Sequence, residues 1–389
     1  MSIRTITGAA VGVATLIGAP ATALRELRQR SCDCAAATDG GPLMYSRRAL
    51  TLLMTLAALL AAAIPSTAGA EKPSKSPAQE LVTFAAAGCA AACGSGSTIG
   101  PDKALYVTDG PGGRVLRIDP KTGTITTFAS GLPAATPGLP FGGAEDVAFY
   151  GGTAYVLVTA VGPFFGQANV IDGLYRIAKN GIPTAIADIG AWSIAHPPAG
   201  FPFVVTTGVQ YALQKFRGGF LVTDGHHNRV LHVSRTGDIS QMIAFGDIVP
   251  TGLEVHGKRI YMGEAGPVPH VPATGNVVKF TPKSTTATDV ASGAPLIVDV
   301  EFGRGRQLYA LSQGIWDLPN DPANAGAPAS HNSGTLLRVK KDGTFASIVE
   351  GLDQPTSVDF IGNTAYVITL TGKVIKVTNV GTANFSKGH

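Results

Sequence analysis

The sequence predicts an all-β fold, a six-bladed β-propeller built from four-stranded blades, and three observations lead to this prediction. Apolar and polar residues alternate with a period of two along many short segments, and glycine-bearing turns separate these segments. The chain has 49 glycines, 26 prolines and only 14% charged residues, a composition that suits strands and tight turns better than long solvated helices. A unit of strands also recurs along the chain.

The clearest repeat is a match between two stretches that lie far apart in the sequence. The stretch "LYVTDGPGGRVLRIDPKTGTI" at 105–125 matches "FLVTDGHHNRVLHVSRTGDI" at 220–239, with V-T-D-G, R-V-L and T-G in the same order. A unit of this size cannot bury its apolar face alone and must stack on copies of itself. Two units of one repeating architecture are the simplest explanation.

Six copies of the unit can be placed on the chain, each starting with an alternating strand and a turn. The starts are "ALYVTDG" at 104, "AYVLVTAVG" at 154, "FLVTDG" at 220, "RIYMGEAG" at 259, "QLYALSQG" at 307 and "AYVITLTG" at 365. A second alternating strand and a Thr-rich strand follow, and a short apolar strand such as "EDVAFYGG" precedes most starts. Four strands per unit result, which favours a radial propeller.

The last unit ends at "KVIKVTN" without a full outer strand. The stretch "LVTFAAAG" at 81–88 precedes the first unit and can supply that strand, so we expect the two ends of the domain to pair. Such pairing closes the ring and removes exposed strand edges. We therefore expect one propeller domain over residues 80–380, a linker at 71–79 and a C-terminal tail at 381–389.

Residues 44–70 have the features of a signal peptide. They combine two arginines, an apolar run over Ala49–Ile64 and an A-G-A ending at Ala70. A run of about 16 residues is short for a membrane span of roughly 20, so we expect cleavage after Ala70 rather than a membrane anchor, with no transmembrane span left. Residues 1–43 lie upstream of this signal, and we expect Met44 to be the true start.

The signal predicts a secreted, periplasmic or cell-envelope protein. Ser46, Arg47 and Arg48 also resemble a twin-arginine signal, although export of the unfolded chain is the route we expect. Residues 71–389 keep 24 of the 30 basic and 23 of the 26 acidic residues, a net charge of +1. This near balance argues against nucleic acid or an anionic membrane surface as partner, and we expect a monomer.

The cysteines give one candidate disulfide. Cys32 and Cys34 lie in the leader, whereas Cys89 and Cys93 form "CAAAC" at the start of the exported chain. In an oxidising compartment these two can close a small loop. The alternative, a metal or redox pair, lacks both a second ligand pair and C-x-x-C spacing.

Several motifs resemble those of a known family. They are "ALYVTDGPGGRVLRID", "TTFASGLP", "GGAEDVAFYGGTAYVLV", "GNVVKF", "SGTLLRVKKDG" and "GLDQPTSVDFIGNTAYVI". With them the chain resembles the secreted propellers related to the scytonemin-cluster ScyD and ScyE proteins, within the wider group of NHL and SMP-30-like propellers. The resemblance covers nearly all of the chain after the signal and implies an exported six-bladed propeller. The motifs are architectural and imply no particular reaction.

One face of a propeller collects the connections between second and third strands together with the connections between blades. We call it the loop face, and it is the usual binding site. Its longest connection, "QGIWDLPNDPANAGAPASHNSG", has about 20 residues and carries Trp316 and His331, while the neighbouring blade's loop carries His270. Aromatic and imidazole groups on one rim would suit a flat organic ligand, with solvated loop residues as the alternative.

The loop "DGHHN" adds Asp224, His226 and His227 as candidate ligand-binding residues, with a histidine as the best candidate base. The alternative is structural, because Asp224 and Gly225 match Asp109 and Gly110 of the first copy and can set a turn by accepting backbone hydrogen bonds. On that interpretation, replacing both histidines with glycine should leave folding nearly intact.

A metal site is a further candidate. The SMP-30-like hydrolases, which the chain resembles, hold a divalent ion with oxygen ligands from inner strands, a set that suits calcium or a similar hard cation. The matching carboxylates are Glu145 and Asp146 in "AEDVAF" and Asp299 and Glu301 in "IVDVEF". Thr251 and Thr356 stand at equivalent positions in two other blades and are poor sole ligands.

The favoured function is binding of a small organic or extracellular ligand on the loop face, with no established catalysis or cofactor. A first alternative is a divalent-metal-dependent hydrolase or lactonase that uses Glu145, Asp146 and Asp299 around the channel. A second is an extracellular protein-interaction scaffold, which predicts a broad apolar rim rather than a deep polar pocket. The sequence contains no G-x-S-x-G, H-E-x-x-H or phosphate-cradling motif and leaves open whether the protein is an enzyme.

Overall fold

The computed structural model of the chain describes residues 78–84, 93–139, 141–199, 204–321, 324 and 326–381. The expected leader and signal peptide, residues 1–70, lie outside the described residues. All structural statements below concern the unit formed by residues 71–389.

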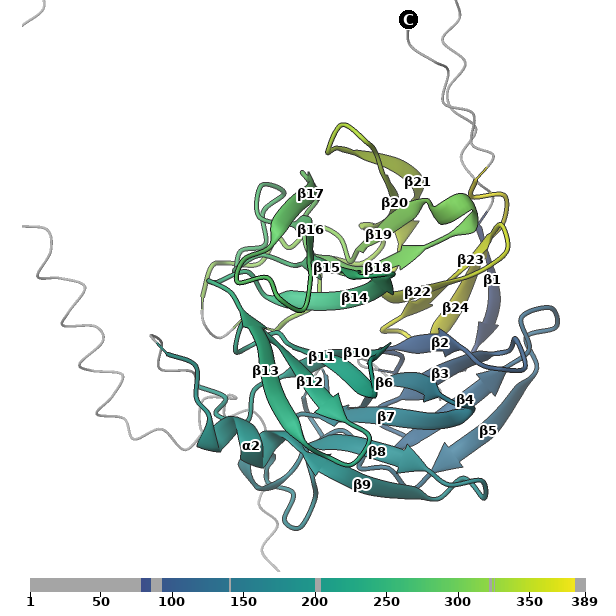
Figure 1. Ribbon diagram of the computed structural model, residues 1–389. Helices are drawn as coiled ribbons and strands as arrows, with labels where there is room; N and C mark the ends of the chain where they lie inside the picture. Colours follow the sequence, from purple (N-terminus) through teal and green to yellow (C-terminus); the bar gives the residue numbers. More distant parts are fainter. Residues whose placement is uncertain are drawn as a thin grey trace, which may run out of the picture. The chain divides into compact units, whose positions relative to one another are not determined.

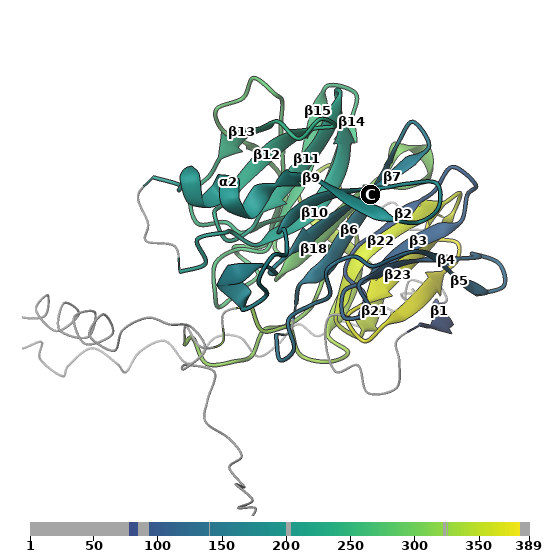
Figure 2. The same cartoon turned by 90° about the horizontal axis from the view of Figure 1, so that it is seen from below.

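The described strands form six four-stranded antiparallel sheets, and this confirms the predicted propeller. Figure 1 shows that the first strand of each sheet, β2, β6, β10, β14, β18 or β22, lies at the centre, and Figure 2 gives the view from below. Each of these inner strands contacts the inner strands of the two neighbouring sheets, and the contact between β2 and β22 completes the ring. We number the sheets as blades 1 to 6 in chain order.

The first three blades comprise residues 97–244. Blade 1 contains β2 (Ser97–Ile99), β3 (Leu105–Asp109), β4 (Arg114–Ile118) and β5 (Ile125–Ser130). Blade 2 contains β6 (Gly143–Tyr150), β7 (Thr153–Thr159), β8 (Gly173–Ile177) and β9 (Pro183–Asp188). Blade 3 contains β10 (Gln210–Phe216), β11 (Gly219–Asp224), β12 (Arg229–Ser234) and β13 (Ile239–Ala244).

The remaining blades follow the same order of strands. Blade 4 contains β14 (Pro250–His256), β15 (Arg259–Glu264), β16 (Asn276–Phe280) and β17 (Thr288–Ser292). Blade 5 contains β18 (Ile297–Phe302), β19 (Leu308–Ser312), β20 (Gly334–Val339) and β21 (Phe345–Leu352). Blade 6 contains β22 (Pro355–Ile361), β23 (Thr364–Thr369), β24 (Lys373–Val377) and, as its outer strand, β1 (Ala78–Thr83).

The pairing of β1 with β24 joins the two ends of the domain, as predicted. The strands are antiparallel, with Ala78 opposite Val377 and Thr83 opposite Lys373. This strand exchange gives blade 6 the outer strand that its own end of the chain lacks. It also ties the last blade to the first segment of the domain, so no blade is left with a missing strand.

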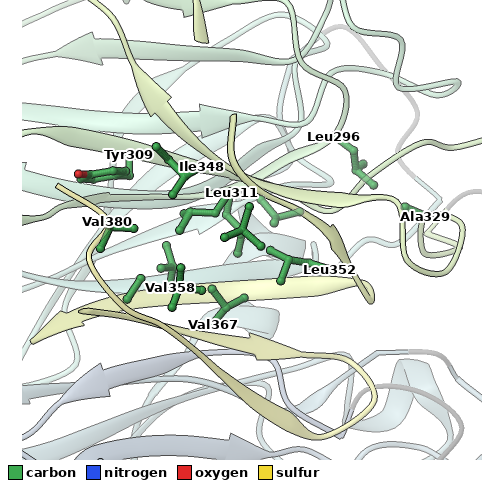
Figure 3. Packing of buried hydrophobic residues seen from close by; sticks show 14 of the residues in the cluster. Leu296, Tyr309, Leu311, Ala329, Ile348, Leu352, Val358, Val367 and Val380 are labelled. Carbon is green, nitrogen blue, oxygen red and sulfur yellow. The ribbon is translucent and has the colours of Figure 1, made fainter. Parts of the chain in front are cut away.

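The apolar core lies between blades. Six clusters of buried apolar residues each combine side chains from two neighbouring blades, for example from β19 and β23 between blades 5 and 6. Figure 3 shows this cluster, in which Tyr309 and Leu311 of blade 5 face Val358 and Val367 of blade 6. Each blade buries its two faces against its neighbours. The apolar residues that recur along the strands therefore form the contacts that hold the ring together.

Little helix interrupts the strands. Helix α2 (Ile189–Ala195) follows β9 and begins at Asp188, whose Oδ1 accepts a hydrogen bond from Ala191 N–H at 2.8 Å. The single-turn helices η2 (Pro163–Phe165) and η3 (Arg304–Arg306) lie in connections. Among the described helices, none is long and apolar enough to cross a membrane.

The antiparallel order assigns each connection to one of two faces. The second-to-third connections, such as β3–β4, and the connections between blades lie on the loop face. The first-to-second and third-to-fourth connections, such as β10–β11 and β12–β13, lie on the opposite face, which we call the turn face.

Candidate functional site

The loop after β3 shows what the repeated aspartate does. Asp109 Oδ1 accepts a hydrogen bond from Gly112 N–H at 2.9 Å, and this fixes the turn. Arg114 Nε donates to Asp109 Oδ2 at 2.6 Å, with about a third of the arginine side chain exposed. The expected turn-setting role of this aspartate is therefore confirmed, and an arginine five residues later completes the motif.

The loop after β11 repeats this geometry in buried form. Asp224 Oδ1 accepts from His227 N–H at 3.2 Å, and Arg229 Nε donates to Asp224 Oδ2 at 3.2 Å. Asp224 Oδ1 also accepts from Val209 N–H at 3.1 Å. The hydrogen bonds of His227, together with the nearby guanidinium of Arg229, keep the pKa of Asp224 below its ordinary value despite burial.

Arg229 is among the most buried side chains of the described chain, with 1% of its surface exposed. Its Nη1 donates to the backbone oxygen of His196 at 2.8 Å, and its Nη2 donates to Ser193 Oγ at 3.0 Å. Its guanidinium lies 5.0 Å from the centre of the Trp192 ring, a cation–π distance. Arg229 thus joins the connection that carries α2 to blade 3 through two hydrogen bonds and a cation–π contact.

The two histidines of "DGHHN" hold the same connection. His227 is buried, with Nε2 at 3.1 Å from the backbone oxygen of Val205 and Nδ1 at 2.9 Å from Arg229 Nη2. The Nδ1 atom also lies 3.0 Å from Asp224 Oδ2, so the ring lies between this carboxylate and the backbone at Val205. His226 is half-buried and its Nε2 accepts from Val205 N–H at 3.2 Å. Burial lowers the pKa of His226.

This placement corrects one expectation from the sequence. The rings of His226 and His227 point to the segment at Val205, so they are neither open to the channel nor simply solvated. Replacing His227 with glycine would remove two contacts that order the connection, so folding is not expected to be unaffected.

The structure brings His270 and Trp316 together. Their rings lie 5.7 Å apart, nearly perpendicular, and join the β15–β16 loop of blade 4 to the β19–β20 loop of blade 5. Both side chains are buried, and Trp316 Nε1 donates to the backbone oxygen of Ala327 at 3.1 Å. His331 is mostly exposed and its Nδ1 lies 2.6 Å from Asp353 Oδ1. The six candidate ligand residues therefore form three separate groups on the loop face.

Inner strands carry the candidate metal ligands toward the central channel. Asp146 on β6 accepts backbone hydrogen bonds from Val147 N–H at 2.8 Å and from Leu213 N–H of blade 3 at 2.7 Å. Asp299 on β18 does the same with Val300 N–H at 2.8 Å and Val358 N–H of blade 6 at 2.7 Å. Each aspartate therefore links its own inner strand to the next one.

Two glycines leave room for these aspartates. A Cβ atom on Gly96 of blade 1 would lie 2.7 Å from the Cα of Asp146, and one on Gly252 of blade 4 would lie 2.6 Å from the Cα of Asp299. Blades 1 to 3 and blades 4 to 6 thus repeat one arrangement: a glycine on one blade, an aspartate on the next, and a backbone N–H on the following strand that donates to the aspartate. Burial raises the pKa of Asp146 well above its ordinary value and that of Asp299 to about 8.

Three more carboxylates line the channel nearer the turn face. Glu254, Glu301 and Asp359 come from the inner strands of blades 4, 5 and 6. Burial raises the pKa of Glu254 to about 7 and of Asp359 to about 6, and burial together with the repulsion of Glu254 raises the pKa of Glu301 well above its ordinary value. Glu254 contacts Gln214 Nε2, and Asp359 Oδ2 accepts from Ser97 Oγ at 2.6 Å.

Tyr211 crosses the channel near the loop face. It lies on β10 of blade 3, and its hydroxyl donates to the backbone oxygen of Thr356 on blade 6, the opposite blade of the ring, at 3.0 Å. Burial, and then the negative charge of Glu145, raises the pKa of the Tyr211 hydroxyl. Glu145 itself is buried, and one of its oxygens, Oε2, has no hydrogen-bond partner among the described residues. Burial raises the pKa of Glu145 to about 8.

The expected metal ligands lie along the same channel, but they are not clustered around one position that a metal ion could occupy. Among the residues that the structure describes, no three His, Cys, Asp or Glu side chains are grouped as a metal site would require. Both oxygens of Asp146 and of Asp299 accept backbone N–H groups, a role in which the carboxylates hold strands together. Asp146 and Asp299 therefore act as links between strands in this structure, and a bound divalent cation stays a prediction.

Some site residues were not identified from the sequence. Tyr211 occupies the inner-strand position that holds Thr251 and Thr356 in other blades, so its larger size at a repeat position was a usable signal. Arg114 and Arg229 stand in both copies of R-V-L, and their recurrence could have been read as a partner for the aspartate. For the candidate disulfide, Cys93 is disulfide-bonded, and Cys89 lies outside the described residues.

Comparisons with known proteins support the fold. No protein-family model matches the chain, and no curated protein does. Among solved structures, a gluconolactonase from Xanthomonas campestris matches with a TM-score of 0.51 and 13% identity, over 77% of this chain and 89% of that one. Virginiamycin B lyase from Staphylococcus aureus matches with a TM-score of 0.47 and 15% identity, over 78% of this chain and 99% of that one. At 13% identity, the likeness to the gluconolactonase shows the fold alone.

Proposed function

We propose that the protein is an exported binding propeller whose loop face docks an apolar surface of another extracellular protein. The observation that carries this proposal is the distribution of exposed large apolar side chains. Of the seven such side chains in the described residues, all but Ile182 lie on loop-face connections. They are Phe164, Ile194, Val204, Val271, Ile315 and Leu318. Single exposed apolar residues are common, but their gathering on one face marks an interaction surface.

Three of these residues form what we call the apolar rim: Val271, Ile315 and Leu318. They stand on the two loops that His270 and Trp316 join. The exposed fractions are 43% for Val271, 59% for Ile315 and 37% for Leu318. Two neighbouring blades thus expose apolar side chains on the loops that the buried contact between His270 and Trp316 joins.

The backbone under the rim is fixed before any partner binds. Ile315 N–H donates to Ser333 Oγ at 2.9 Å, and the Ile315 backbone oxygen accepts from Ser330 N–H at 2.8 Å. Gln354 Nε2 donates to the backbone oxygen of Ala329 at 2.6 Å, which ties the same loop to the start of blade 6. Backbone segments that are held by hydrogen bonds lose little conformational entropy on binding, so the exposed apolar groups that they carry are efficient contacts.

The closed channel favours a broad partner. Tyr211 spans the channel beneath the loop face and stands in the way of a ligand that enters from this face. Such a ligand must therefore be bound by the surrounding loops. An apolar rim on the loops of two neighbouring blades fits the interaction-scaffold function better than a deep site for a small organic molecule.

The test compares two variants with matched chemistry. The triple variant V271S/I315S/L318S removes the rim, and Ile182→Ser removes one exposed apolar side chain from the turn face. We expect the wild type and Ile182→Ser to capture the same protein from culture supernatant, and the triple variant to lose it. Equal capture by all three forms would contradict the proposal. Loss of binding of the dye 8-anilinonaphthalene-1-sulfonate by the triple variant, without any captured protein, would assign the rim to a small ligand instead.

Glu145 favours a second candidate function, a divalent-metal-dependent hydrolase. Its buried Oε2 has no partner among the described residues, and its charge acts on Tyr211 together with those of Asp146 and Asp299. A cation bound there would supply Lewis-acid chemistry and stabilise the ionised carboxylates. Metal analysis of the protein that starts after Ala70 decides this candidate. If no stoichiometric divalent ion is found and a chelator leaves the melting temperature unchanged, the hydrolase function fails.

A further inference from the structure

Charged residues are separated between the two faces of the propeller. Within the described residues, the loop-face connections contain no lysine or arginine. At the strand ends beside them, Arg114, Arg229 and Lys373 are each paired with a carboxylate. The exposed acidic residues on this face include Asp188, Asp247, Asp317 and Asp321. The turn-face connections hold Asp102, Asp119, Asp238 and Asp342, but together with the strand ends beside them they hold many more basic residues. These are Lys103, Lys121, Lys179, Lys215, Arg217, Arg235, Lys258, Arg259, Lys283, Arg304, Arg306, Lys340 and Lys341. The net charge of +1 for residues 71–389 hides this separation.

Six of the basic residues surround part of the channel mouth, because the first-to-second turns belong to the innermost strands. We call them the basic arc: Lys215, Arg217, Lys258, Arg259, Arg304 and Arg306. They come in pairs from the β10–β11, β14–β15 and β18–β19 turns of three successive blades. All six are exposed, and in the described part of the chain none forms an ion pair with a carboxylate.

A hollow lies within the basic arc, between blades 3 and 4. Its lining residues are Gln214, Lys215, Phe216, Arg217, Val255 and Gly257. The side chains of Lys215 and Arg217 also lie over aromatic rings, at 5.1 Å from the centre of Tyr150 and 5.2 Å from that of Phe216. The ring under Arg217 belongs to a residue that lines the hollow, whereas the ring under Lys215 belongs to blade 2, and both contacts hold the cations against the protein surface.

The nearest carboxyl groups do not neutralise the positive charge of the basic arc. Glu254, Glu301 and Asp359 lie in the channel behind it, and Asp299 follows toward the loop face. These carboxyl groups lie on the inner strands, whereas the six cations of the basic arc lie at the exposed turns where inner strands end. The turn face therefore presents a positive potential to the solvent.

We propose that the basic arc is a docking site for an acidic polysaccharide. A linear chain with regularly spaced anions can meet paired cations on three successive turns. Exposed large apolar side chains are nearly absent from this face, with Ile182 as the one instance among described residues, so there is little to insert into a membrane. No exposed large aromatic side chain lies on the described turn face to stack on nucleic acid bases, which leaves binding through charge alone.

The loop face carries the opposite charge, so an acidic polymer should bind at the turn face and not at the loop face. Asp188, Asp247, Asp317 and Asp321 repel a polyanion from the loop face, so it approaches the turn face. The protein could then hold an acidic polymer on one face and keep the apolar rim free on the other. This inference does not depend on the function of the rim.

The test uses polygalacturonate, a linear carboxylated polysaccharide, with uncharged dextran as the negative control. Fluorescence anisotropy should show binding of polygalacturonate that weakens linearly on a plot of log affinity against log salt. The variants K258Q/R259Q and R304Q/R306Q should each weaken binding by about tenfold at low salt and reduce the salt slope. The control K121Q/K179Q removes the same charge from outer turns of the same face and should change affinity far less.

Three outcomes would overturn the inference. Equal losses in K121Q/K179Q and in the arc variants would show that net charge, and not the arc, determines binding. No measurable binding of polygalacturonate at low salt would remove the site altogether. Tighter binding of duplex DNA or of phosphatidylserine vesicles, lost in the same arc variants, would assign the arc to a different class of partner. The rim variant V271S/I315S/L318S should bind polygalacturonate as the wild type does, which separates this test from that of the rim.

Discussion

The hydroxyl group of Tyr211 lies 3.0 Å from the backbone oxygen of Thr356, and this hydrogen bond spans the central channel from blade 3 to blade 6. The two residues are 145 positions apart in the chain. The tyrosine ring also packs against the apolar cluster between blades 5 and 6. One side chain therefore spans the channel and joins opposite sides of the ring.

Shortening Tyr211 should reveal both roles. Tyr211→Phe removes only the hydroxyl and should lower the free energy of unfolding by about 1 kcal/mol, whereas Tyr211→Ala should lower it by about 3–5 kcal/mol because it also leaves a cavity. Denaturant titration measures both values. Tyr155→Phe, at a buried tyrosine whose ring packs on Phe220, serves as the control. A Tyr211→Ala variant as stable as Tyr211→Phe would show that the ring does not fill the channel.

The two copies of the aspartate–arginine motif should differ strongly in energy. Arg229→Met leaves Asp224 buried without its charged partner and should cost about 3–5 kcal/mol of stability. Arg114→Met breaks the equivalent pair with Asp109, but about a third of that arginine side chain is exposed, so we expect a cost below about 1 kcal/mol. Urea denaturation of the two variants provides the comparison. Similar costs would mean that burial does not set the value of this motif.

The adjacent histidines should be separable by mutation. His227→Gly removes a buried ring with contacts to Val205 and Arg229 and should lower stability by about 1–3 kcal/mol. His226→Gly, at a half-buried ring with one such contact, should cost less. Thermal melts at neutral pH test the difference. If His226→Gly were the more damaging change, the placement of the two rings would be wrong.

Stability should fall as the pH rises, because several channel carboxyl groups keep their protons in the folded state. Their pKa values are raised to about 8 for Glu145 and Asp299 and to about 7 for Glu254, whereas the same groups in the unfolded chain ionise near pH ~4. Between these values the folded state binds more protons than the unfolded state. The free energy of unfolding should therefore be highest on the acid side of this window and decrease up to about pH 8.

Glu145→Gln isolates one of these groups. Gln cannot ionise, so the variant should show a shallower loss of stability between pH 5 and 8, by up to about 1.4 kcal/mol per pH unit. The measurement is a series of denaturant titrations across this range, with Asp289→Asn at an exposed carboxylate as the control. A slope equal to that of the wild type would contradict the raised pKa of Glu145.

Glycine 252 should be intolerant of a side chain. A Cβ atom there would lie 2.6 Å from the Cα of Asp299, a backbone atom that cannot move away independently, so Gly252→Ala should cost about 1–3 kcal/mol. At Gly246 a Cβ atom would meet nothing within 4 Å, and Gly246→Ala should be nearly neutral. The melting temperatures of the two variants check this prediction. Equal values would show that blades 4 and 5 can separate to admit the methyl group.

The sequence by itself determined the all-β class, the six blades, the four strands per blade and the closure by the two ends of the domain. It could do so because strand periodicity and the repeat are local properties, and a repeat unit with one apolar face has to stack. The turn-setting role of Asp109 was also local, since its Oδ1 bonds to a backbone group three residues away. The export signal, the ScyD and ScyE resemblance and a bound calcium stay predictions.

Only the tertiary structure decided how separate blades combine. It placed Tyr211 across the channel, set Asp146 and Asp299 between inner strands, and buried Arg229 under the connection that carries α2. It also placed exposed apolar side chains on one face and basic turns on the other. Such arrangements depend on which residues of distant repeats meet after the ring closes, and pairwise distances of this kind leave no periodic trace in one sequence.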